Sequence, residues 1–172
     1  MEDSRNVVDQ YKGQSIEAIV HDLDAHSMSL EIAVENLTRD FNMGTIIRSA
    51  NAFGVRHVHV IGRRQWNKRG AMMTDKYLHL HYHETIDAFI EAVKGKQVIA
   101  VDNVEGSILL GKTSLPRDAV LVFGSEGDGL SDEMLQKAAQ IVAIEQFGST
   151  RSLNVGVAAG IVMYEWLRQN TL

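Results

Sequence analysis

The chain has 172 residues, 45% of them hydrophobic, and a formal net charge of −5 at pH 7. This length predicts one compact domain with a sizeable core, and the acidic balance argues against a general nucleic-acid coat protein while permitting a local basic patch. The absence of cysteine excludes disulfides and thiolate metal sites and favours a cytoplasmic protein. The longest uncharged apolar stretch, residues 153–164, is too short to span a bilayer, and the N-terminus lacks a signal pattern.

Helical and strand-like segments alternate along the chain. Apolar residues from Ile16 to Leu23 have helical spacing, with Ser15 as a candidate N-cap, and two further helical stripes cover 43–53 and 86–93. The expected strands are Leu30–Val34, His57–Ile61, Val98–Val101, Ala119–Phe123 and Ile141–Ile144. Because these strands are short and almost continuously apolar, they predict a parallel sheet covered on both faces, which is a three-layer α/β fold.

Three polar, glycine-containing segments follow or adjoin these strands. Residues 42–48 open a helix, residues 124–131 hold three glycines around Glu126 and Asp128, and residues 144–160 lead from a strand into a helix of small residues. The carboxyl ends of parallel strands meet at one edge of a sheet, so the three segments predict a single ligand site. The helix N-terminus at Asn42 and the guanidinium of Arg48 suit an anion such as phosphate. Taken singly, a capped surface helix and a tight acidic turn are alternatives for the first two segments.

Two further patterns concern metals and nucleic acid. The run His79-Leu-His-Tyr-His83, placed in a strand, puts three imidazoles on one face about 7 Å apart. No cysteine or clustered carboxylate completes a metal site, so we predict a structural or RNA-adjacent strand and no metal. A basic cluster with one aromatic residue suits a folded RNA, with a solvated loop as the alternative. Its members are Arg63, Arg64, Trp66, Lys68, Arg69 and Lys76.

Taken together, the three segments resemble the ordered motifs of the SPOUT methyltransferases, and most closely the TrmH (SpoU) branch of RNA ribose 2′-O-methyltransferases. The matching patterns are Asn42-x-Gly-x-x-x-Arg48, Phe123-Gly-Ser-Glu-x-x-Gly-Leu130 and Ile144-x-Gln-x-Gly-x-x-x-Ser-Leu-Asn-Val155. The resemblance covers about residues 30–168. It implies a parallel α/β sheet with a deep C-terminal trefoil knot, which general folding rules never predict. It also implies bound S-adenosylmethionine, an RNA substrate (tRNA or rRNA) and a homodimer with the site near its interface.

The resemblance also implies a division of the chain and a set of site residues. Residues 1–29 form a short N-terminal helical extension, and residues 30–172 form the SPOUT methyltransferase domain. The implied catalytic residues are Arg48, Asn42, which helps to orient it, Glu126, Ser152 and Asn154. The implied cofactor-binding residues are Val101, Asp102, Gly124, Ser125, Gly127, Ile144, Gln146, Ser152 and Leu153. Arg63, Arg64, Lys68 and Arg69 are the expected RNA-binding residues.

The pKa of arginine, above about 12, makes it a poor general base. We therefore favour a role in which Arg48 binds the adjacent phosphate and stabilises the developing alkoxide.

The sequence departs from the family pattern in three respects. Glu145 stands where proline is usual, which predicts a less rigid loop, and Gly156 stands where serine or alanine is common. The chain also lacks the long C-terminal extension and separate RNA-binding domain of some relatives, which leaves the target RNA open. Two other functions compete: a non-catalytic RNA-binding relative and a base-directed SPOUT methyltransferase. The retained polar residues argue against the first, and the pairing of Asn42 with Arg48 argues against the second.

Overall fold

The computed structural model describes residues 7–36, 42–125 and 127–172. Seven strands of this described chain form one sheet in the order β3-β2-β1-β6-β4-β7-β5, with parallel neighbours throughout. The strands are β1 (Glu31–Asn36), β2 (His57–Gly62), β3 (His79–His83), β4 (Gln97–Val101), β5 (Ile108–Leu109), β6 (Ala119–Phe123) and β7 (Gln140–Ala143).

Every α-helix of the described chain except α2 (Met43–Ala52) begins at a polar residue whose side chain caps its free N–H groups. Ser15, Thr85 and Ser131 each accept a hydrogen bond from the backbone N–H three residues later, at 3.1–3.2 Å. The α-helices are α1 (Ile16–Ala25), α2 (Met43–Ala52), α3 (Ile86–Ala92), α4 (Asp132–Lys137) and α5 (Val155–Asn170). Short 3₁₀ turns are η1 (Asp9–Tyr11), η2 (Lys68–Ala71), η3 (Thr74–Lys76) and η4 (Leu110–Lys112). The predicted N-cap at Ser15 is thereby confirmed.

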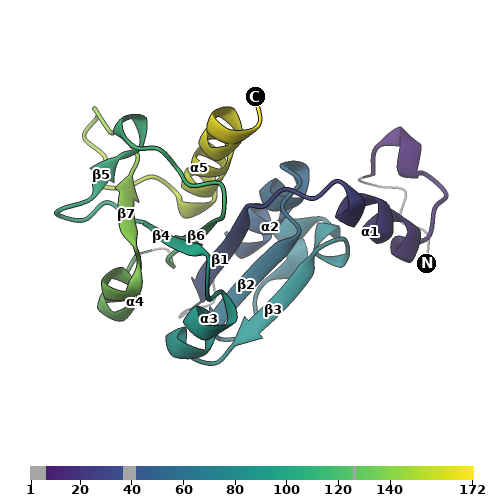
Figure 1. Cartoon of the computed structure of the whole chain (residues 1–172), viewed down its shortest axis with the longest axis horizontal. Helices are drawn as coiled ribbons and strands as arrows, with labels where there is room; N and C mark the ends of the chain where they lie inside the picture. Colours follow the sequence, from purple (N-terminus) through teal and green to yellow (C-terminus); the bar gives the residue numbers. More distant parts are fainter. Residues whose placement is uncertain (1–6, 37–41, 126) are drawn as a thin grey trace.

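Helices cover both faces of the sheet, as the apolar strands predicted. On one face, α2 and α5 bury residues such as Ile46 and Trp166 against β1 and β6. On the other, Phe89 of α3 and Met134 of α4 form a second core. Figure 1 shows this arrangement, with α1 set apart beside the β2–β3 edge. The three-layer parallel α/β architecture is therefore correct.

Two elements were not among the expected ones: β5 and α4. Strand β3 was predicted from its alternating histidines and is confirmed; it lies at an edge of the sheet and lacks the apolar continuity of the inner strands. The two residues of β5 and the six of α4 are too short to show a period. No helix in the described ranges is long and apolar enough to cross a membrane.

Candidate cofactor and RNA site

The polar segments gather at one edge because of the strand order. Strands β1, β6, β4 and β7 are consecutive neighbours, and Phe123 lies level with both Val34 and Val101. All four strands point the same way, so the residues that follow them leave the sheet at the same edge. The chain also reverses its direction of strand addition here, with β2 and β3 on one side and β4, β7 and β5 on the other. Such a switch point is where open α/β sheets bind ligands.

Asn42 and Asn154, 112 residues apart in the chain, are in direct contact. The Nδ2 of Asn154 donates to Oδ1 of Asn42 at 2.9 Å. The Oδ1 of Asn154 accepts from the backbone N–H groups of Gly156 and Val157, at 3.0 and 3.2 Å, and so caps α5. This one amide joins the first segment to the third and fixes the start of α5. Gly156 lies against the same junction, since a Cβ there would be 3.1 Å from Cγ2 of Thr45.

The first segment also contacts the basic loop. A Cβ on Gly44 would lie 2.6 Å from the backbone N of Ala71 and 2.8 Å from Gly70, so only glycine fits where α2 meets η2. This contact places η2, with Lys68 and Arg69, beside the N-terminal turn of α2. Arg48 is exposed in the second turn of the same helix. The structure therefore brings the predicted RNA-binding loop close to the predicted catalytic helix.

The second segment closes into a tight loop. Ser125 and Gly129 exchange two backbone hydrogen bonds, of 3.1 and 3.2 Å. A Cβ on Gly124 would lie 2.2 Å from the carbonyl carbon of Gly129, and Gly127 has a φ of +100°. Glu126, which the resemblance makes catalytic, lies outside the described residues.

Asp102, predicted to bind the cofactor, holds this loop in place. Its Oδ2 accepts from the backbone N–H of Leu130 at 2.8 Å, and its Oδ1 accepts from that of Asn103 at 2.7 Å. Asn103 in turn donates through Nδ2 to the backbone O of Arg151 at 3.2 Å. The residues after β4 therefore connect the second and third segments.

Two buried oxygens at this edge are available to a ligand. The Oγ of Ser125 and the Oε1 of Gln146 are buried and have no hydrogen-bond partner among the described residues. A buried polar atom left unpaired costs about 1–3 kcal/mol, so such atoms mark positions that a ligand or water satisfies. Val101 and Ile144 are half-buried beside them, and Ser152 and Leu153 are exposed. Phe147 on the same loop is 95% exposed.

The basic loop offers both charge and aromatic surface. The Arg64 guanidinium lies 4.5 Å from the centre of the Tyr82 ring, and Lys68 Nζ lies 5.6 Å from that of Trp66. Lys68 also pairs with Asp75 at 3.0 Å. Arg63 and Arg69 are exposed in the same loop. Charges next to ring faces are the combination that binds and stacks single-stranded nucleotides.

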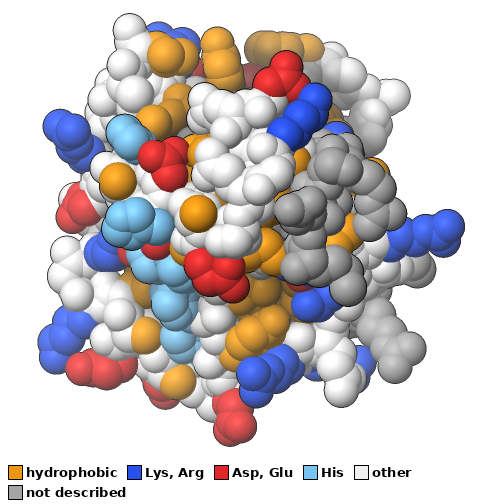
Figure 2. Space-filling model, turned by 90° about the vertical axis from the view of Figure 1, so that its right-hand side faces the viewer, with side chains coloured by type: hydrophobic (Ala, Val, Ile, Leu, Met, Phe, Trp, Pro, Cys, Tyr) orange, Lys and Arg blue, Asp and Glu red, His pale blue; other side chains and the backbone are white. Residues whose placement is uncertain are grey.

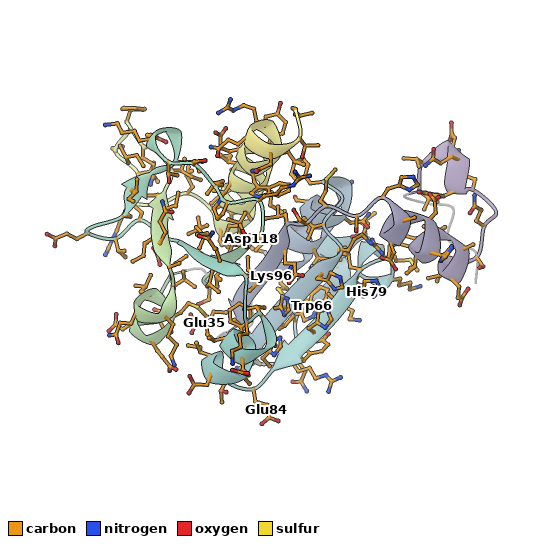
Figure 3. The ribbon with its side chains drawn as sticks, viewed as in Figure 1. Glu35, Trp66, His79, Glu84, Lys96 and Asp118 are labelled. Carbon is orange, nitrogen blue, oxygen red and sulfur yellow. The ribbon has the colours of Figure 1, made fainter. Side chains whose placement is uncertain are left out.

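A row of five histidines crosses β2 and β3 on the face that α3 covers in part. Nδ1 of His57 and Nε2 of His81 are 3.0 Å apart, and the matching nitrogens of His59 and His83 are 2.9 Å apart. His79 begins the row beside α1, and Glu84 lies past the opposite end of β3 (Figure 3). Figure 2 shows histidines gathered on this face. The run on β3 therefore lies on one face, as expected, but the two partners on β2 were not anticipated.

Acidic and basic groups border this row. Nε2 of His59 lies 2.9 Å from Oε2 of Glu31, and Lys96 Nζ lies 2.6 Å from Oε1 of the same carboxylate. Burial alone raises the pKa of Glu31, but these two hydrogen bonds outweigh it and lower the pKa from 4.5 to about 2. At the other end, Asp24 accepts from Arg56 at 2.8 Å and lies 3.0 Å from His79.

Burial and neighbouring imidazoles lower the pKa of His57, His81 and His83. Within the described ranges, no group of three or more His, Asp or Glu side chains is arranged to hold a metal ion.

Glu35 is a second feature that sequence reasoning missed. It is buried at the end of β1, where its Oε2 accepts from the backbone N–H of Ser131 at 2.9 Å. This bond ties the first strand to the N-cap of α4, next to the second segment. Its signal in the sequence was a single carboxylate at the end of an apolar strand, which is too common to single out.

The fold and this edge define a class of protein: a parallel α/β protein whose polar loops meet at a topological switch point, the place where such sheets bind small polar ligands. Comparison with known proteins narrows the class. Residues 29–164 match the SpoU rRNA Methylase family, and the chain belongs to that family. It is 28% identical over 145 residues to the tRNA (guanosine(18)-2′-O)-methyltransferase of Escherichia coli K12, covering 81% of this chain and 63% of that protein. The chain thus spans somewhat less than two thirds of that relative.

Solved structures agree with this assignment. The A. aeolicus TrmH/SpoU tRNA modifying enzyme has a TM-score of 0.78 at 25% identity, over 90% of this chain and 81% of that one. A protein whose structure gives insights into 2-OH methylation of C/U34 on tRNA has a TM-score of 0.73 at 29% identity, and the match covers 83% of this chain and 96% of that one. The SpoU methyltransferase AviRb from Streptomyces viridochromogenes, in complex with AdoMet, has a TM-score of 0.72 at 25% identity, and the match covers 81% of this chain and 57% of that one.

Proposed function

We propose that this chain transfers the methyl group of S-adenosylmethionine to a ribose 2′-hydroxyl of a tRNA or rRNA. One observation carries the proposal. This SpoU-family chain joins Asn42 to Asn154 at the same sheet edge where the buried Ser125 and Gln146 oxygens have no hydrogen-bond partner among the residues that the structure describes. Two relatives are named for 2′-O or 2-OH methylation of tRNA, and these names support RNA as the substrate class.

The residues at the edge fit the cofactor. The buried Ser125 Oγ and Gln146 Oε1 supply a donor and acceptor for its polar groups, and the second and third segments offer backbone at Gly124, Gly127 and Leu153. S-adenosylmethionine supplies an electrophilic methyl carbon on a sulfonium, which is lost as a neutral thioether. Ile144 and Val101, half-buried at the ends of their strands, provide apolar contact. The AdoMet-bound SpoU neighbour supports this cofactor.

Arg48 acts on the RNA. Its guanidinium, exposed near the N-terminus of α2, binds the phosphate next to the target ribose and stabilises the negative charge that develops on the 2′-oxygen as the hydroxyl proton passes to solvent water. Asn42, the N-cap residue of α2, accepts a hydrogen bond from Asn154, and this bond fixes the first turn of the helix that carries Arg48. Ser152, exposed on the third segment, and Asn154 shape the pocket for the cofactor and the hydroxyl. The same role of Glu126 is proposed from the family resemblance alone, since this residue lies outside the described ones. Positioning of the reacting groups supplies much of the rate, and the basic residues 63–69 hold the surrounding RNA.

The active form is a homodimer with a knotted C-terminal region. A hollow of about 510 Å³ on α5 and its neighbours is lined by Ser49, Leu110, Gly156, Val157, Gly160, Ile161, Tyr164 and Glu165. Val157 and Tyr164 are 53% and 52% exposed, so α5 presents an apolar stripe that a second copy would cover. The trefoil knot is proposed from the resemblance of residues 123–155 to the family motifs.

We also propose that residues 1–29 form an extension to a methyltransferase domain of residues 30–172. The start of the family match at residue 29 supports this boundary. A cytoplasmic location remains a prediction from the cysteine-free composition.

The test is direct. The protein is titrated with S-adenosylmethionine by calorimetry and then incubated with methyl-labelled cofactor and either total tRNA or total rRNA. We expect binding and a 2′-O-methylated nucleotide in one RNA pool, with tRNA positions 18 and 34 examined first. A methylated base would favour the base-directed alternative, and binding without transfer to either pool would favour a non-catalytic relative.

A further inference from the structure

The third segment is held at its first residues by a carboxylate. Glu145 is half-buried, and its Oε1 accepts a hydrogen bond from the backbone N–H of Gly111 at 2.8 Å. Gly111 belongs to η4, whose first residue, Leu110, is buried in the main core. The segment therefore begins on a side chain anchored to a rigid part of the molecule, 34 residues earlier in the chain.

The absence of a side chain at Gly111 lets the Glu145 carboxylate approach its backbone N–H. A Cβ built on Gly111 would lie 2.8 Å from Oε1 of Glu145 and 3.7 Å from the carboxyl carbon, and apart from the adjoining residues nothing else in the described chain comes within 4 Å. Among the described residues, the obstacle to a larger residue at 111 is thus the end of a flexible side chain. Alanine at this position would displace the carboxylate while leaving the backbone as it is.

The contact lies immediately before a residue that faces the cofactor site. Gln146 follows Glu145, and its Oε1 is buried without a partner in the described part of the chain. At the far end of the loop, Asn103 donates to the backbone O of Arg151 at 3.2 Å. Between these two ties Phe147 is 95% exposed, so the loop has little core packing to hold it. Its position therefore depends on the hydrogen bonds at its ends.

We propose that Glu145 is a positioning residue for cofactor binding: its bond to Gly111 fixes the start of the third segment and thereby the carboxamide of Gln146. This inference rests on the proposed cofactor site. The carboxylate takes over the restraint that a rigid backbone residue would supply at this position. The hydrogen bond to Gly111 is thus a restraint on the start of the loop that the sequence did not reveal.

The experiment compares Glu145→Ala, Glu145→Gln, Gly111→Ala and the double variant Gly111→Ala/Glu145→Ala with the wild type. Calorimetry gives the Kd for S-adenosylmethionine, and steady-state kinetics with saturating RNA give kcat and the KM for the cofactor. We expect Kd and KM to rise about tenfold in Glu145→Ala and in Gly111→Ala, with kcat within twofold. Glu145→Gln keeps an acceptor oxygen and should stay within twofold of the wild type throughout.

The double variant separates this contact from general damage. Because both single changes break the same bond, the double variant should bind no more weakly than either single one. Glu105→Ala removes an exposed carboxylate from the loop after β4 and controls for charge. Thermal unfolding of all variants should agree within a few degrees.

The inference is overturned if wild type binds the cofactor and Glu145→Ala binds it equally well, or if the two single losses add. Failure of wild type to bind at all would instead contradict the proposed function.

Discussion

Acidification should destabilise the pairing of β2 with β3, because the paired histidines cannot both be protonated without losing their hydrogen bond. Each hydrogen-bonded pair, His57 with His81 and His59 with His83, needs one nitrogen to donate and the other to accept. A pair with both rings protonated has donors on both sides, so the bond is lost and two positive charges face each other.

The ring separations set the size of the effect. The ring centres of the two pairs are 5.2 and 5.1 Å apart. Two unit charges at that distance repel by about 1 kcal/mol in water and about 3 kcal/mol at an effective dielectric constant near 20. The rings of β3 are partly exposed, so we take the lower figure, which gives about 2 kcal/mol for the two pairs.

The direction of the pH dependence follows from the pKa shifts. Burial lowers the pKa of His57, His81 and His83 below 6.5, so below that pH the unfolded chain binds more protons than the folded one. The stability that they contribute is complete above pH 6.5 and decreases as the pH falls through their folded pKa values. Glu31, with a pKa lowered to about 2, loses its contribution only between pH 4.5 and 2. The interval from pH 7.5 to 5.5 therefore isolates the histidines.

The assay is urea unfolding at pH 7.5 and 5.5. We expect the wild-type free energy of unfolding to fall by about 2 kcal/mol and that of His81→Gln/His83→Gln to fall by less than half as much. His26→Gln is the control, since that side chain on the C-cap of α1 is 78% exposed. The reasoning is refuted if the wild-type value is constant over this interval, or if the double variant loses as much as the wild type.

Three further predictions concern the site and the interface. Arg48→Ala should bind S-adenosylmethionine as the wild type does but lose methyl transfer to RNA by at least about a hundredfold; full activity in a labelled-transfer assay would contradict its role. Gly44→Ala should lower the free energy of unfolding by about 1–3 kcal/mol, because its Cβ meets the backbone of Gly70 and Ala71. Gly148→Ala, with open space around its Cβ, should change it little, and equal values in chemical denaturation would count against the packing argument. If the proposed homodimer forms through the exposed stripe of α5, Tyr164→Asp should convert it to monomer in light scattering at micromolar concentration. A monomeric wild type would remove the basis for that prediction.

Much of the fold could be read from local patterns. The helices that start near Ile16, Met43 and Ile86 and the inner strands were predicted to within two residues at their starts, because helix and strand periods reflect neighbours a few positions away. The edge strand β3 was also predicted, from the strand period of its imidazoles, although it lacks the apolar character of the inner strands. The polar segments at the site were also evident from sequence, because glycine-rich loops after strands are local features.

The class of fold, the order of the three polar segments and the residues that they contribute could all be inferred from local sequence patterns. The contacts between those residues could not: Asn154 with Asn42, Glu145 with Gly111, Asp102 with the backbone of Leu130. The same holds for the histidines, whose pairing across β2 and β3 depends on a strand register that aligns His59 with His81. The physical reason is distance along the chain. A period or a cap is set by bonds within one or two turns, whereas these contacts join residues 22–112 positions apart and exist only once the sheet has assembled.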